Sequence, residues 1–195
     1  MTSPFVSVIV PNYNHAQYLE QRLDTVFNQT YQNFEVIILD DKSTDNSLEV
    51  ISKYKDNPHL SQIVVNEQNS GSPFKQWDKG INLANGELVW IAESDDYNEL
   101  TFLEELITEW GKHKKVVVAF SNYVQFWGDK YSYYKERATQ CFNGERYVKY
   151  RQVRGNNLLN ASGVVFLRKV YEKVGREFME FRNAGGYMFW TSVLH

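Results

Sequence analysis

The sequence has little cysteine, no long hydrophobic run and no excess of basic residues, and each absence excludes a class of protein. Cys141 is the only cysteine among 195 residues, so no internal disulfide can form and a reducing compartment is expected. No apolar stretch approaches the roughly 18 residues that cross a bilayer, and the N-terminus lacks a signal-peptide pattern. These absences indicate a cytoplasmic location, with the inner face of the membrane as the alternative.

The charge and composition of the chain favour an ordinary globular protein. Its 21 Lys and Arg residues against 24 Asp and Glu residues give a net charge of −3, so nucleic acid is not an expected partner. A hydrophobic content of 43% supplies an ample core for a chain of 195 residues. Because no linker, internal repeat or low-complexity stretch interrupts the sequence, we expect a single domain over residues 1–195.

The first 120 residues alternate between short apolar runs and segments with helical spacing. The apolar runs predict strands at 5–10, 34–39, 61–65, 88–92 and 116–120. The segments between them predict helices at 16–27, after 43–45, after 69–73 and at 102–110. In the second of these helices, Leu48, Ile51 and Tyr54 form the expected apolar face. This order predicts an α/β fold with a mostly parallel central sheet and helices on both faces.

The alternation ends after residue 121. The stretch 123–134 is rich in aromatic residues and contains a Gly-Asp pair, which predicts a hairpin or an irregular flap. Beyond it we expect a short helix near 145–152, a strand at 163–167, a helix at 169–174 and a last helix within 180–195.

The most informative segment is 88–96, where an apolar run ends in a cluster of acidic residues. Glu93, Asp95 and Asp96 are three carboxylates within four positions, and such a cluster is unfavourable unless it is solvated or neutralised by a cation. Magnesium and manganese bind one or two carboxylates together with substrate phosphate, so the segment predicts a metal-diphosphate site. The alternative is a solvated loop in which Asp96 or Asn98 caps the next helix.

Two further polar clusters follow predicted strands. Residues 11–14 (PNYN) come after the first strand and residues 40–43 (DDKS) come after the second. Each of them alone is also explained as a turn or a helix cap. Because parallel strands place their carboxyl ends at one edge of a sheet, we expect these clusters and 93–96 to converge on one shared site.

The combined motifs resemble the family-2 glycosyltransferases, the large inverting group with the GT-A fold. The resemblance covers nearly the whole chain and rests on a series of short matching segments: 6–14, 28–31, 34–43, 45–47, 69–71, 80–81, 84–86, 93–96 and 160–163. It implies a GT-A fold in which residues 1–120 form the nucleotide-binding half and residues 121–195 form the acceptor half. Relatives usually continue past His195, so the acceptor half is expected to be shortened at its C-terminus.

The resemblance also implies which residues bind the nucleotide. Pro11, Tyr13 and Asp41 match the positions that hold the base and ribose, with a surface for ring stacking and an acceptor for the N–H of the base. Lys75 lies where the family often has a basic residue and contacts either the base or the diphosphate; an exposed surface lysine is the alternative. The favoured donor is a UDP-sugar.

The acidic motif is implied to hold the metal. Asp95 matches the position directed at the ribose and the metal, and Asp96 matches the position on the metal, which is Mg²⁺ or Mn²⁺. Glu93 occupies a position that is more often aspartate, and its longer side chain still allows an indirect contact through water.

The implied reaction transfers a sugar from a nucleotide-diphosphate donor to an acceptor hydroxyl with inversion, as in cell-surface polysaccharide synthesis. In the family a carboxylate base begins a late helix, in a pattern like Ala-Gly-Asp-x-x-x-Trp-x-Arg. This chain has Gly186 at the position of the base and Ser192 at the position of the arginine. Glycine cannot act as a base, so the alternative function is a nucleotide-sugar-binding module with impaired catalysis, and no catalytic residue is assigned.

The acceptor is expected to be a glycan or a lipid-linked sugar. The aromatic residues after residue 121 either form a wall for this acceptor or pack in the core: Tyr123, Phe126, Trp127, Tyr131 and Tyr134. A basic group either contacts a phospholipid-linked acceptor, with peripheral membrane association, or is a solvated helix face: Arg146, Lys149, Arg151 and Arg154.

Overall fold

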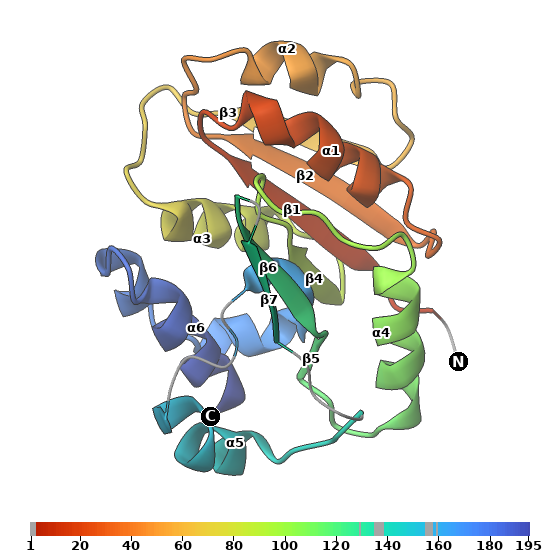
Figure 1. Cartoon of the computed structure of the whole chain (residues 1–195), viewed down its shortest axis with the longest axis vertical. Coiled ribbons are helices and arrows are strands. Elements are labelled where there is room, and N and C mark those ends of the chain that lie inside the picture. Colours follow the sequence, from red (N-terminus) through yellow and green to blue (C-terminus); the bar gives the residue numbers. More distant parts are fainter. Residues whose placement is uncertain (1–2, 129, 135–138, 155–157, 159) are drawn as a thin grey trace.

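A computed structural model describes residues 3–128, 130–134, 139–154, 158 and 160–195, apart from the side chains of Trp127 and Tyr134. Figure 1 shows a central sheet with helices on both faces and a separate hairpin in front of it. The sheet has six strands in the order β3-β2-β1-β4-β8-β5. Their bounds are β1 (Val6–Asn12), β2 (Phe34–Asp40), β3 (Leu60–Val65), β4 (Leu88–Ile91), β5 (Val118–Phe120) and β8 (Val164–Leu167).

The sheet is mostly parallel, as predicted. Strand β1 pairs in parallel with both β2 and β4, and β2 pairs in parallel with β3. Strand β8 runs antiparallel between β4 and β5. This insertion separates β5 from β4, the strand before it in the chain, and it is the part of the sheet order that the first 120 residues do not specify.

The helices cover both faces because nearly every residue of the central strands is apolar. One face of the sheet packs against α3 (Pro73–Leu83) and α6 (Gly185–Leu194), and the other packs against α1 (Ala16–Phe27), α2 (Ser47–Ser52) and α4 (Phe102–Lys112). Residues of β1 alternate between the faces: Ile9 belongs to the first core and Val8 and Val10 to the second. Burial of both faces explains why these strands lack the alternation of half-exposed strands.

The second half contains shorter elements. Strands β6 (Tyr123–Trp127) and β7 (Lys130–Tyr134) form an antiparallel hairpin, which confirms the hairpin alternative for this stretch. Helix α5 (Gly144–Tyr150) lies near the expected position. The helix expected at 169–174 is a 3₁₀ helix, η3 (Arg168–Lys173), and the other 3₁₀ helices are η1 (Gln152–Arg154), η2 (Ala161–Gly163) and η4 (Glu177–Glu180). Within the described residues no helix is long and apolar enough to cross a membrane.

One predicted apolar face is wrong in part. Ile51 is buried and Tyr54 stacks on Phe27 at 5.4 Å between ring centroids, but Leu48 is 43% exposed. Helix α2 has only six residues and ends at Ser52. A helix this short does not form a regular apolar stripe along one face.

Candidate functional site

The turns that follow β1 and β2 are joined by hydrogen bonds. The strand register places Asn12 opposite Asp40, and Nδ2 of Asn12 donates to Oδ2 of Asp40 at 2.8 Å. Oδ1 of Asn14 accepts from the main-chain N–H of Thr44 at 2.7 Å. Asn14 and Lys42 have positive φ angles of 55° and 66°, a backbone conformation that costs free energy in a non-glycine residue. The two turns therefore form one rigid unit that contains local strain.

The third turn joins this unit through His15. A ring nitrogen of His15 lies 2.8 Å from the hydroxyl of Ser94, which is buried directly after Glu93. The main-chain N–H of Ala92 donates to the carbonyl of Ile9, so the end of β4 lies beside the end of β1. The predicted convergence of the three turns is therefore present in the structure. Nothing in the sequence around His15 indicates this bond.

Asp41 lies below the surface and binds the loop that precedes α3. Its carboxylate oxygens accept hydrogen bonds from Asn66 Nδ2 at 2.5 Å, from the main chain and hydroxyl of Ser70 and from Gln76 Nε2 at 3.0 Å. The side chain is only 4% exposed. Asp41 was predicted to accept a bond from a base. The structure shows that it already accepts several bonds from the protein and fixes the shape of the loop.

The other residues expected at the nucleotide differ in exposure. Pro11 is buried within β1, whereas Tyr13 is 45% exposed. Lys75 is exposed on the first turn of α3, and its Nζ donates to the carbonyl of Ser70 at 3.1 Å. Lys75 and Arg176 line a hollow of about 1000 Å³ between the 69–73 loop and the segment before α6.

Glu93 is partly buried, and its carboxylate is bound by a side chain of α3. The indole N–H of Trp77 donates to Oε1 of Glu93 at 2.6 Å. Burial raises the pKa of Glu93 to about 7; the hydrogen bond from Trp77 opposes this rise, and the charges of Asp95 and Asp96 add to it. Burial and the neighbouring charges therefore favour the protonated form of Glu93 more than in a solvated carboxylate.

Asp95 and Asp96 have the exposure expected of metal-binding carboxylates. Asp95 is exposed and Asp96 is partly exposed, and neither carboxylate has a hydrogen-bond or ion-pair partner within the described residues. Helix α4 begins at Phe102 after Thr101, so the alternative in which Asp96 or Asn98 caps this helix is wrong.

The acidic turn fits a metal that is shared with a substrate. Among the described residues no group of three or more His, Cys, Asp or Glu side chains is arranged to hold a metal by itself. Two neighbouring carboxylates without protein partners suit a magnesium or manganese ion that completes its coordination with water and diphosphate oxygens. The donor set therefore fits such an ion only together with a ligand.

Buried polar atoms without partners gather at the same place. In the described part of the chain four such side-chain atoms occur: Asn12 Oδ1, Arg22 Nη2, Ser72 Oγ and Gln76 Oε1. Asn12 lies in the first turn and Gln76 contacts Asp41 of the second, while Arg22 contacts the third. Three of the four atoms therefore belong to residues that form or contact the polar turns at the carboxyl edge of the sheet.

Gly186 is the second residue of α6 and lies beside Trp77. A Cβ at this position would stand 3.6 Å from the Trp77 ring and 3.8 Å from the Phe74 ring, which are ordinary contact distances. The start of α6 therefore packs beside α3 and has room for a small side chain at position 186.

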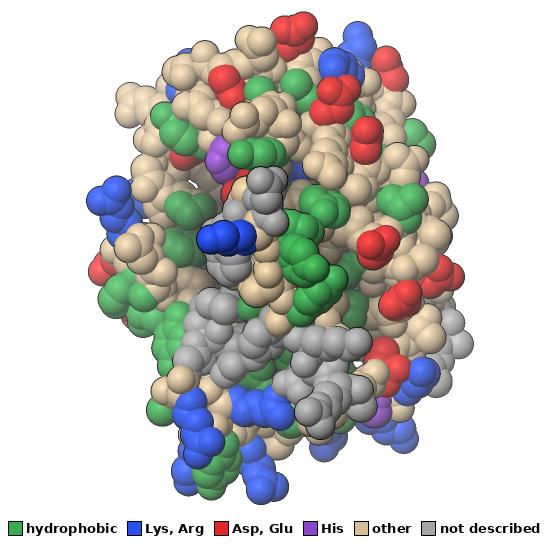
Figure 2. Space-filling model, viewed as in Figure 1, with side chains coloured by type: hydrophobic (Ala, Val, Ile, Leu, Met, Phe, Trp, Pro, Cys, Tyr) green, Lys and Arg blue, Asp and Glu red, His purple; other side chains and the backbone are tan. Residues whose placement is uncertain are grey.

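The hairpin residues lie on the surface rather than in the core. Figure 2 shows hydrophobic side chains gathered over β6 and β7 on this face of the molecule. The ring of Phe126 stacks on Tyr97 at 6.4 Å between centroids, and Tyr97 directly follows Asp96. The core-packing alternative is therefore wrong for Phe126 and Tyr131, which are 55% and 60% exposed. The expected Trp127 and Tyr134 side chains lie outside the described part.

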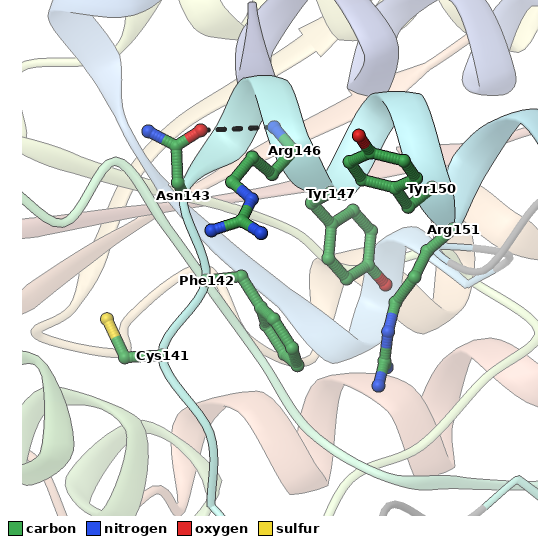
Figure 3. Close-up of a pocket in the computed structure, with 7 residues that line it drawn as sticks. All are labelled: Cys141, Phe142, Asn143, Arg146, Tyr147, Tyr150 and Arg151. Atoms are coloured by element: carbon green, nitrogen blue, oxygen red, sulfur yellow. Dashed lines mark hydrogen bonds between the residues drawn. The ribbon is translucent and has the colours of Figure 1, made fainter.

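A second hollow of about 270 Å³ lies beside α5 (Figure 3). It is lined by residues 141–143, 146–147 and 150–151 and includes none of the three polar turns. The guanidinium of Arg151 lies 4.5 Å from the ring centroid of Phe142, and Asn143 caps α5 through the N–H of Arg146. Both alternatives for the basic residues stay open, because they are neither buried nor part of the converging site.

Comparison with known protein families matches residues 7–175 to "Glycosyl transferase family 2". The chain belongs to this family. The match includes the three polar turns and the hairpin, and it confirms the resemblance carried by the sequence motifs.

Named relatives and solved structures agree with this membership. Glycosyltransferase GlyG of Streptococcus pneumoniae is 35% identical over 124 residues, which cover 64% of this chain and 40% of the relative. A crystal structure of Staphylococcus aureus TarS residues 1–349 superposes with a TM-score of 0.70 at 22% identity, covering 97% of this chain and 55% of that one. The chain thus has the GT-A fold, and it spans about half the length of these relatives.

A third comparison concerns a neighbour with ligands. Mannosyltransferase PcManGT of Pyrobaculum calidifontis, in complex with GDP-Man and Mn²⁺, superposes with a TM-score of 0.61 at 21% identity, covering 90% of this chain and 48% of that one. At this identity the likeness supports the fold alone.

Sequence reasoning missed two side chains that shape the site, and only Arg22 had a weak signal. Arg22 falls among Leu19, Leu23 and Val26 on the buried stripe of α1, where a charge is unexpected. Trp77 lies on the buried stripe of α3, and its position gives no indication that its N–H reaches Glu93.

Proposed function

We propose that the chain transfers a sugar from a nucleotide-diphosphate donor to an acceptor hydroxyl with inversion. The observation that carries this proposal is the meeting of three polar turns at the carboxyl ends of β1, β2 and β4, where two carboxylates have no hydrogen-bond partner among the described residues. In open α/β sheets ligands bind at this edge. Membership in glycosyltransferase family 2 supports the reaction class.

The nucleotide is proposed to lie between the exposed Tyr13 ring and the 69–72 loop that Asp41 fixes. Lys75 then lies within reach of the base or diphosphate from the first turn of α3. Uridine diphosphate is the favoured nucleotide, and the neighbouring TarS structures in complex with UDP and UDP-GlcNAc support this choice.

Asp96 and Asp95 are proposed to hold a magnesium or manganese ion that the diphosphate shares. The ion supplies positive charge where the leaving diphosphate develops negative charge. Asp95 and Asp96 orient the diphosphate, and Glu93, directed at Trp77, contributes charge from below the exposed carboxylates. The acceptor is proposed to be a glycan or lipid-linked sugar in cell-surface polysaccharide synthesis, as the names of relatives such as poly(ribitol-phosphate) β-glucosyltransferase support.

The second candidate is a nucleotide-sugar-binding module with impaired catalysis. It is favoured by Gly186, which leaves the start of α6 without a carboxylate where the family has its base. The two candidates agree on donor binding and differ in turnover.

A calorimetric titration with UDP, GDP and ADP, with and without Mn²⁺, followed by a donor-hydrolysis assay, tests both. Tighter UDP binding in the presence of Mn²⁺ supports the site. Equal affinity with and without Mn²⁺, or no binding, contradicts it. Nucleotide binding without donor hydrolysis supports the nucleotide-sugar-binding module.

A further inference from the structure

Arg22 is an unusual residue for its position. It lies in the middle of α1, on the stripe that packs against the sheet, and its side chain has 0% exposure. Arginine is almost never fully buried unless its charge is compensated. A buried guanidinium in an otherwise apolar helix face therefore needs a specific reason.

The guanidinium of Arg22 donates hydrogen bonds to both ends of the acidic turn. Nε donates to the carbonyl of Glu93 at 2.8 Å, and Nη1 donates to Oδ1 of Asn98 at 2.8 Å. The two bonds bracket the segment that carries Asp95 and Asp96. Asn98 in turn donates to the carbonyl of Ser162 at 2.9 Å, and the hydroxyl of Ser162 accepts from the N–H of Glu93 at 2.9 Å.

The charge of Arg22 is balanced by the carboxylates of this turn. Burial lowers the pKa of Arg22 to about 10, and the charges of Asp96, Glu93 and Asp95 act in the opposite direction. Nη2 is buried without a partner in the described part of the chain, and the face of the guanidinium lies 5.8 Å from the Trp90 ring centroid. A charge with an unpaired donor stays buried here because three carboxylates lie close to it.

We propose that Arg22 is a positioning residue for the metal-diphosphate site: a built-in cation that holds the acidic turn in its binding shape before metal arrives. It offsets part of the repulsion among Glu93, Asp95 and Asp96 from beneath, and it leaves the exposed Asp95 and Asp96 free for the metal. This inference rests on the proposed function, because it concerns the same site.

The first test needs no metal and no activity. Met fills much of the volume of Arg22 without charge, so Arg22→Met is expected to lower the melting temperature by about 10 °C. In this variant the carboxylates repel without compensation, so adding Asp96→Asn should recover several degrees. The same Asp96→Asn change in the unmodified chain should alter the melting temperature by about 2 °C at most. Strictly additive effects of the two substitutions would overturn the proposal.

The second test measures UDP affinity by calorimetry with and without MnCl₂. Arg22→Met should reduce the Mn²⁺-dependent gain in affinity at least about tenfold and leave metal-free UDP affinity within about twofold. Arg22→Lys keeps the charge and at most one of the bonds, so it should recover part of the gain. If Arg22 acted only through its positive charge, its removal would strengthen Mn²⁺ binding. An Mn²⁺-dependent gain in UDP affinity that is unchanged or larger in Arg22→Met therefore overturns the positioning role.

Arg168 provides a matched control. Its Nε also donates to a main-chain carbonyl, that of Gly86 at 2.8 Å, but at the opposite end of β4 from the acidic turn. Arg168→Met should lower stability and keep the full Mn²⁺-dependent gain. A loss of the gain in this control would show that general destabilisation explains the Arg22 result and would overturn the proposal.

The two tests separate this inference from the proposed function. If the unmodified chain shows no Mn²⁺-dependent gain, the metal part of the proposed function fails. The melting temperatures of the Arg22→Met and Asp96→Asn variants, measured without metal, then still decide whether Arg22 holds the acidic turn.

Discussion

Trp77 connects the acidic motif with the start of the last helix: its indole N–H binds Glu93 at 2.6 Å, and its ring packs 3.6 Å from the Cβ position of Gly186. Position 186 is therefore linked to the acidic motif through the Trp77 side chain. A small side chain fits at position 186, because the rings of Trp77 and Phe74 lie at ordinary contact distances from its Cβ position.

We predict that Gly186→Asp raises sugar-donor turnover. A general base contributes roughly 100- to 10,000-fold to a rate, and the start of a helix favours negative charge. Nucleotide affinity should hardly change. Release of UDP from a UDP-sugar checks this, with Gly186→Asn as a control of the same shape that lacks a base. Equal turnover in the unmodified chain and the Asp variant would show that another residue is the base, and Glu177 and Glu180 would be tested first.

Asp96→Asn should abolish the effect of Mn²⁺ on nucleotide binding and leave the fold intact. The side chain is partly exposed and has no protein partner in the described residues, so its loss should change stability by only about 0.5 kcal/mol. Removal of one of three close negative charges should also lower the pKa of Glu93 from its raised value of about 7. UDP titrations with Mn²⁺, together with thermal unfolding, decide this; a Mn²⁺ effect that survives would exclude Asp96 as a ligand.

Asp41→Asn is expected to affect stability and nucleotide binding together. An amide cannot accept all the bonds that Asn66, Ser70 and Gln76 donate, so the variant should lose about 1–3 kcal/mol of stability. The loop should loosen, and UDP affinity should fall with and without Mn²⁺. Urea unfolding and calorimetry measure the two effects. Lower stability with unchanged UDP affinity would show that Asp41 has a purely structural role.

The sequence predicts the strands and helices that alternate regularly along the first part of the chain. Apolar runs place the central strands within one or two residues, and polar residues after them locate the site, because parallel strands share one carboxyl edge. Arg22 and Trp77 are not predicted because their roles depend on contacts with residues far away in the sequence. The position of β8 between β4 and β5 is likewise fixed by tertiary pairing, since its four residues fit many places in a sheet.

Glu35 predicts a pH dependence of stability far from the acidic turn. Burial alone would raise its pKa, but hydrogen bonds from Ser7 at 2.6 Å and from Asn85 outweigh burial and hold the pKa below the ordinary 4.5. A carboxyl group whose pKa is lower in the folded than in the unfolded state stabilises the fold at pH values above its unfolded-state pKa. This contribution is lost as the pH falls through the folded-state pKa. The unmodified chain should therefore lose more stability than Glu35→Gln between about pH 5 and pH 3, as urea unfolding measures. Parallel pH curves would contradict this.

The exposed aromatic rings of the hairpin predict a separate acceptor effect. Phe126 contacts Tyr131, and Tyr131 contacts Tyr133 at 5.4 Å between centroids, so the rings form a series that begins at Tyr97. A tyrosine ring has an apolar face and a polar edge, which suits a sugar ring with the same division.

Tyr131→Ala and Tyr133→Ala should therefore raise the KM for a glycan acceptor several-fold and leave donor hydrolysis unchanged. Each should change stability by only about 0.5 kcal/mol, because the side chains are 60% and 69% exposed. Leu48→Ala, which shortens an apolar side chain with 43% exposure on α2, serves as the control. Acceptor kinetics that are the same in all three variants would show that the hairpin does not contact the acceptor. A fall in donor hydrolysis in the hairpin variants would instead place the rings at the donor.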